Sequence, residues 1–251
     1  MIKPKNYIGC SGFSERLWKG FFYPEDLASK DFLAFYSQRL NAVEINSTFY
    51  RKPTQKTLQN WGNATPEDFK FFIKIPKAIT HLQKLVDTHD MTVAFCEHID
   101  TGLQDKLAGL LFQLPPSFKY SDENLQKVLA TVDNRFVNVV EFRHVSWWSD
   151  EVKTTLKQAN IVMAGVSILL KSTDNQIPNE IVINDEDTLY YRLHGVPIMF
   201  KSEYSEEALK SLAEKIKNFD GQKYVFFNNT FGIAGIKNAL FLHQLLNDQN
   251  A

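Results

Sequence analysis

The chain has little cysteine, almost no net charge and no long apolar run. Cys10 and Cys96 are the only cysteines among 251 residues, too few for a disulfide framework, and no Cys-x-x-Cys pair points to zinc binding or thiol exchange. The polar segment 1–6 is not followed by an apolar stretch of secretion-signal length, and no stretch approaches the roughly 18 apolar residues of a membrane span. We therefore expect a cytoplasmic protein with no membrane partner.

The near-equal numbers of positive and negative residues limit the kinds of partner that the protein can bind. Lys and Arg total 28 against 29 Asp and Glu, a net charge of -1, which excludes a strongly basic nucleic-acid binder and an acidic tail but leaves room for a local basic cleft. The 44% of hydrophobic and 23% of charged residues are ordinary for a globular domain. With no internal repeat or linker, we expect residues 1–251 to form a single domain.

Short apolar runs recur along the chain and predict strands. Several are almost continuously apolar, which is typical of strands buried on both faces of a parallel sheet. The eight runs are Tyr7–Ser11, Ala42–Thr48, Lys70–Pro76, Gly109–Leu114, Val137–Arg143, Ile161–Ile168, Leu189–Gly195 and Tyr224–Asn229.

Most of the segments between these runs have apolar residues at the spacing typical of helices. Helices are expected over 26–41, after Ser121, over 149–160, after Ser205 and over 236–246, and in two pieces over 79–106. Strands and helices in alternation predict an α/β fold, a TIM-like (β/α)8 barrel of parallel strands. A doubly wound open sheet is the main rival, but Gly9-Cys-Ser-Gly12 lacks the third glycine of a dinucleotide loop. The sixth βα unit should be irregular, because 171–187 is polar, contains Pro178 and shows no helical pattern.

Polar side chains gather where the predicted strands end. Side chains in a strand alternate faces with a period of two, so polar pairs at i and i+2 can point together into the mouth of a barrel, where TIM-barrel active sites lie. The polar strand-end residues are Glu44, Asn46, Lys74, Gln113, Glu141, Arg143, Arg192, His194 and Asn228.

The sign of these charges favours an anionic ligand. Three of the residues are cations and two are carboxylates, so their formal sum is +1 with His194 neutral, and higher if His194 becomes protonated near its reference pKa of about 6.5. Arginine can grip a carboxylate or a phosphate with two parallel hydrogen bonds. The competing interpretation is a structural ring of ion pairs that plugs the barrel.

Seven ordered motifs resemble the YecE-like family, also called domain of unknown function seventy-two. They include Val43-Glu-Ile-Asn-Ser-Thr-Phe-Tyr50, Leu111-Phe-Gln-Leu-Pro-Pro116 and Tyr190-Tyr-Arg-Leu-His-Gly195, and the resemblance covers nearly the whole chain. It implies a TIM-like barrel with no securely established activity. It also adds Tyr50 and His81 to the residues that line a shared cleft. Cys10 stands where the family has a small residue, which argues for a buried structural role.

Three functions remain open from the sequence. The first is an enzyme (a hydrolase, lyase or isomerase) acting on a small anionic or phosphorylated substrate, with Glu44 or Glu141 as base and His194 as acid, or the reverse. The second is a metal-dependent hydrolase or nuclease, but no His-x-His or His-Glu-x-x-His spacing supports it, and we predict no metal or other cofactor. The third is a non-catalytic barrel that binds a ligand or nucleic acid through aromatic loop residues. The substrate-binding residues predicted for the first are Asn46, Tyr50, Lys74, His81, Gln113, Arg143, Arg192 and Asn228. The oligomeric state is left open.

Overall fold

The strands form two parallel sheets. The computed structural model describes residues 6–170 and 174–247. One sheet has the order β1-β9-β8-β7 and the other β2-β3-β4-β5-β6, and every pairing within them is parallel. Parallel neighbours need crossover connections, and the helices supply most of them, so the predicted α/β class with parallel strands is confirmed. The strands are β1 (Asn6–Cys10), β2 (Ala42–Ile45), β3 (Lys70–Lys74), β4 (Leu107–Gln113), β5 (Asn138–Glu141), β6 (Ile161–Met163), β7 (Gly165–Ser167), β8 (Thr188–Leu193) and β9 (Gln222–Phe227).

The sixth predicted strand is shared between the sheets. It is divided at Ala164 into β6, which pairs with β5, and β7, which pairs with β8. The connection that follows has no helix within residues 174–187, as its polar sequence predicts. Instead, Glu180 forms an antiparallel bridge with Val166, and the Asn184 side chain accepts a hydrogen bond from the amide of Met163 at 2.8 Å. Side chains and one short bridge therefore hold this segment against the strand.

Side chains also span the gap between β1 and β2. The Asn41 Oδ1 accepts from the amide of Ile8 at 2.9 Å, and its Nδ2 donates to the carbonyl of Asn6 at 2.7 Å. The Tyr36 hydroxyl accepts from the amide of Cys10 at 2.7 Å. These bonds satisfy backbone groups of β1 that face the other sheet.

The inner faces of the two sheets pack on each other. A cluster of fully buried side chains draws on both sheets, and its centre is Phe72 of β3. The Phe72 ring lies 4.6 Å from Tyr190, 4.8 Å from Tyr224 and 5.9 Å from Phe226, measured between ring centroids. A larger apolar core lies between the strands and the helices. The strands are therefore buried on both faces, which explains their continuous apolar sequences.

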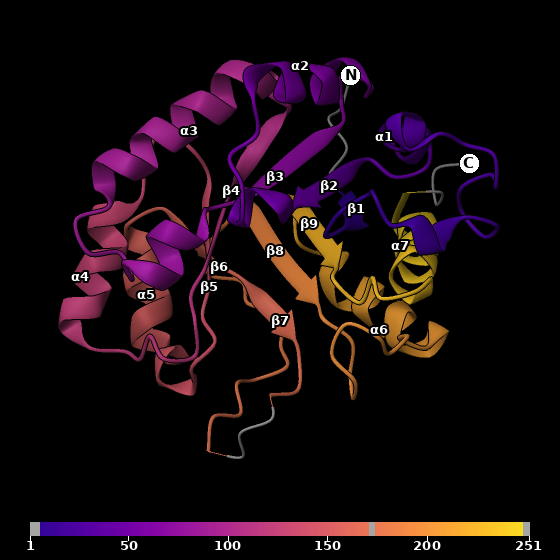
Figure 1. Ribbon diagram of the computed structural model, residues 1–251. Coiled ribbons are helices and arrows are strands. Elements are labelled where there is room, and N and C mark those ends of the chain that lie inside the picture. Colours follow the sequence, from indigo (N-terminus) through magenta and orange to yellow (C-terminus); the bar gives the residue numbers. More distant parts are fainter. Residues whose placement is uncertain (1–5, 171–173, 248–251) are drawn as a thin grey trace.

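Helices lie outside the strands, with α3, α4 and α5 on one side and α1, α6 and α7 on the other (Figure 1). The helices expected after Ser121, over 149–160 and after Ser205 are present, and each of the three serines accepts a hydrogen bond from the first turn of its helix. The helix expected over 26–41 is shorter than predicted, because Ala28 is extended and a 3-10 turn precedes it. The helices are α1 (Phe32–Tyr36), α2 (Gln55–Asn63), α3 (His89–Leu103), α4 (Asp122–Thr131), α5 (Asp150–Gln158), α6 (Glu206–Ile216) and α7 (Ala234–Asn247). In the part of the chain that is described, no helix is long and apolar enough to span a membrane.

Candidate functional site

Six of the predicted site residues form one hydrogen-bonded network at the carboxyl ends of the strands. We call this network the charged cluster. Its members come from β2, β5 and β8 and from the residues that follow β5, β8 and β9, so segments distant in sequence meet as the alternation of strand side chains predicts. The charged cluster consists of Glu44, Glu141, Arg143, Arg192, His194 and Asn228.

Arg192 lies at the base of the charged cluster, between its two carboxylates. Its Nη1 donates to Glu141 at 2.5 Å and its Nη2 to Glu44 at 2.6 Å. The side chain is 1% exposed and both carboxylates are fully buried. The two carboxylates therefore occupy both terminal nitrogens of Arg192, and this geometry favours a positioning role over direct contact with a ligand.

The two carboxylates are ionised despite their burial. Burial alone would raise the pKa of Glu44, but the charge and hydrogen bonds of Arg192 outweigh it and lower that pKa. The pKa of Glu141 lies well below its usual value, because Arg143 and Arg192 outweigh burial there too. Ser11 and Tyr190 donate further hydrogen bonds to Glu44, at 2.6 Å and 2.5 Å. Such a strongly stabilised carboxylate is a weak base.

His194 is a neutral imidazole inside this network. It is fully buried, and burial together with the charge of Arg143 lowers its pKa to about 3. Its Nε2 lies 3.1 Å from a terminal nitrogen of Arg143, and its Nδ1 lies 2.9 Å from the amide nitrogen of Asn228. Arg143 also donates through Nε to Glu141. The extra positive charge considered for His194 is thus absent at neutral pH.

Lys74, at the end of β3, differs from the two arginines. Its ammonium donates to Gln113 Oε1 at 2.9 Å and lies 4.2 Å from the centroid of the Phe49 ring. No carboxylate of the described chain pairs with it, and burial and the charge of Arg192 lower its pKa to about 8. Since two arginines balance the two carboxylates of the charged cluster, Lys74 leaves one net positive charge there.

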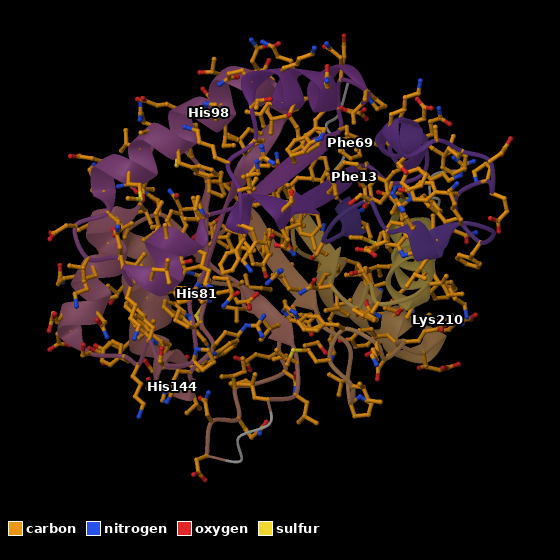
Figure 2. All side chains as sticks on the ribbon, in the orientation of Figure 1. Phe13, Phe69, His81, His98, His144 and Lys210 are labelled. Atoms are coloured by element: carbon orange, nitrogen blue, oxygen red, sulfur yellow. The ribbon has the colours of Figure 1, made fainter. Side chains whose placement is uncertain are left out.

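The other three predicted residues, Asn46, Tyr50 and His81, make no described hydrogen bond to the charged cluster. Tyr50 is 81% exposed and packs edge-on against Phe49, 5.0 Å between centroids. His81, labelled in Figure 2, lies on the turn Ala78–Leu82 after β3. Its ring also packs edge-on against Phe49, with 4.8 Å between the centroids. Burial and the charge of Lys74 lower the pKa of His81 to about 4. The buried Oδ1 of Asn46 has no hydrogen-bond partner among the described residues.

Sequence reasoning missed three residues of the site, Ser11, Tyr190 and Phe49. Tyr190 stands two residues before Arg192 on the same face of β8, so the period-two pattern that paired Arg192 with His194 also pointed to it. Ser11 ends the first strand, but a lone serine carries no comparable signal. The role of Phe49 as the ring under Lys74 depends on a tertiary contact that no sequence spacing encodes.

The structure also bears on nucleophile and metal chemistry. Cys10 is fully buried and burial raises the pKa of its thiol, in agreement with the structural role predicted for it. Among residues 6–170 and 174–247, no three His, Cys, Asp or Glu side chains are grouped so as to hold a metal ion.

Comparisons with known proteins agree with the resemblance seen in the motifs. The family model "Protein of unknown function DUF72" matches residues 7–251. UPF0759 protein YunF of Bacillus subtilis is 24% identical over 96% of this chain and 94% of that protein. UPF0759 protein YecE of Escherichia coli K12 is 28% identical over 45% of this chain and 42% of its own.

A crystal structure of a DUF72 family protein from Thermotoga maritima has a TM-score of 0.84 and 31% identity, covering 96% of this chain and 98% of that one. A DUF72 family protein from Enterococcus faecalis shares the fold, with a TM-score of 0.81 at 21% identity over 96% and 95% of the two chains. The chain therefore belongs to the DUF72 family of proteins of unknown function.

Proposed function

We propose that the protein is an enzyme that acts on a small anionic or phosphorylated substrate, bound at the carboxyl ends of the strands beside Lys74 and Arg143. The observation that carries this proposal is the Lys74 ammonium, which contacts an amide oxygen and an aromatic ring but no described carboxylate. A half-buried cation without a counter-ion attracts an anion more strongly than one already paired.

The proposed chemistry is acid–base catalysis by Lys74. Proton transfer is most efficient when the pKa of the catalytic group lies near the working pH, and the pKa of Lys74 is lowered to about 8. The buried carboxylates and His194 are held in one protonation state at neutral pH, so in this proposal they orient Arg192 and Arg143. A hydrolase, lyase or isomerase could use such a group.

The first test measures stabilisation by inorganic phosphate. Phosphate should raise the melting temperature of the wild type in a saturable way, since a ligand at 100 times its dissociation constant stabilises by about 2.7 kcal/mol. Lys74→Met should fold, because the ammonium forms no ion pair with a described carboxylate and contacts only an amide oxygen and an aromatic ring. The variant should lose most of the phosphate effect. Differential scanning calorimetry over a phosphate series at constant ionic strength provides the measurement.

Lys70→Met is the matched control for this test. Lys70 begins the same strand that Lys74 ends, so the substitution is chemically identical but lies at the opposite edge of the sheet. It should leave the phosphate effect unchanged. Equal phosphate stabilisation of Lys74→Met and the wild type would refute the assignment of Lys74 to the anion site.

We further propose that the two sheets close into one TIM-like barrel. The support is the shared segment around Ala164 on one side, the bridges from Asn41 and Tyr36 on the other, and the inner cluster that both sheets contribute to. Closure would bring the carboxyl ends of all strands around one mouth, which is where the charged cluster lies.

Closure predicts slow hydrogen exchange along β1. The amide of Ile8 donates to the Asn41 side chain, so it should exchange as slowly as amides inside the sheets. Asn41→Ala should speed exchange at Ile8 far more than at Val225, whose strand pairs with β1 on the other side. NMR exchange measurements would show this, and fast exchange of Ile8 in the wild type would argue for an open edge.

A further inference from the structure

A pocket of about 450 Å³ lies next to Phe49, between the turns Ser47–Phe49 and Ala78–Leu82 and helix α3. Its walls are apolar, and Ile79 and Phe95 are 0% and 4% exposed. At the mouth, Leu82 and Met91 are 69% and 43% exposed. Large apolar side chains around a concave apolar wall are typical of a binding site for an apolar group.

Three cations line the same pocket. Arg51, Lys52 and Lys77 are all exposed, and within the described chain none of them forms an ion pair. No aspartate or glutamate of the described residues lines the pocket. The local charge of the lining is therefore positive without compensation, and its complement is an anion.

We propose that this pocket binds an amphipathic organic anion, an aliphatic or aromatic body that carries a carboxylate or a phosphate. The volume lies in the range of small-molecule sites, and the apolar walls would take the body while the cations take the charged end. An inorganic anion would leave the apolar walls in contact with water, and a neutral hydrocarbon would make no ionic contact with the three cations. Lys74 does not line this pocket, so the site is distinct from the anion site proposed above, although both touch Phe49.

Methionine methyl NMR can test the proposal with decanoate as the probe, kept below its micelle-forming concentration. The chain has only 4 methionines, and Met91 lines the pocket while Met163 is fully buried in β6. Decanoate should shift the Met91 methyl signal in a saturable way and leave Met163 unchanged. Decyltrimethylammonium, which has the same chain and the opposite charge, should bind at least about tenfold more weakly.

Variants separate the two halves of the proposal. The double variant Arg51→Glu, Lys77→Glu should weaken decanoate binding about tenfold or more, and Leu82→Asp should weaken it as well. Lys210→Glu, on α6 and far from His81 in Figure 2, should bind decanoate like the wild type. Lys74→Met should also retain decanoate binding, which keeps this test independent of the phosphate test. Equal binding of the two probes, no saturable shift of Met91, or an equal shift with inorganic phosphate would each overturn the proposal.

Discussion

Replacing Arg192 with methionine is expected to lower the free energy of unfolding by about 3–5 kcal/mol. The substitution would leave Glu44 and Glu141 fully buried and without the guanidinium that each of them contacts. Breaking a buried pair by removing one partner is far more damaging than replacing all partners with apolar groups, because an uncompensated charge remains. Urea denaturation at pH 7, followed by circular dichroism, measures the loss.

Removing one of the buried carboxylates that Arg192→Met leaves without a partner should restore part of the lost stability. Arg192→Met combined with Glu44→Gln should be more stable than Arg192→Met alone, because one of the two uncompensated carboxylates is gone. Lys210→Met, on the exposed surface of α6, should change stability by no more than about 0.5 kcal/mol. A loss below about 1 kcal/mol for Arg192→Met would contradict the view that Arg192 neutralises both carboxylates.

Arg192 and Lys74 are expected to have different roles among the polar residues at the strand ends. In the lower part, Arg192 donates a hydrogen bond to each of Glu44 and Glu141, which is the pairing that a structural ring of ion pairs requires. The upper part, with Lys74, Gln113 and the partly exposed Arg143, carries the positive charge that is left over. Under the proposed function, the two interpretations of the sequence apply to different layers. Mutations of Arg192 and Lys74 should then give different phenotypes: lost stability for Arg192 and lost anion response for Lys74.

The sequence predicted which residues meet at the candidate site better than it predicted which of them form ion pairs with one another. The i, i+2 spacing of Glu141 with Arg143 and of Arg192 with His194 was enough to place these groups at one edge, because strand side chains alternate strictly. Which cation neutralises which carboxylate depends on strands that are distant in sequence, and no local pattern encodes it. The same limit applies to the division of the sixth strand at Ala164, which follows from its two different neighbours. Helix α2 was missed because its sequence is polar and only Leu58 is buried.

The stability of the protein should fall steeply with acidification from pH 6.5, and His194 should account for about 2 kcal/mol of the fall between pH 6.5 and 4.5. In the unfolded chain this histidine takes up a proton near pH 6.5, whereas in the folded protein burial and Arg143 hold its pKa at about 3. Across that window the unfolded state binds more protons, so the free energy of unfolding must decrease as the pH falls. Urea titrations at half-unit intervals give the slope.

The variant His194→Gln isolates this contribution. Glutamine cannot titrate, so the variant should be less stable at pH 7 but should show a flatter dependence on pH between 6.5 and 5. His81→Gln should flatten the profile to a smaller extent, since His81 is only partly buried and water screens its charge. Below about pH 4.5 the ionised Glu44 and Glu141 add their own loss, because their lowered pKa values stabilise the fold only while they stay ionised. An unchanged slope above pH 5 in His194→Gln would mean that the imidazole is charged in the folded protein, and the charged cluster would then carry one more positive charge than its contacts imply.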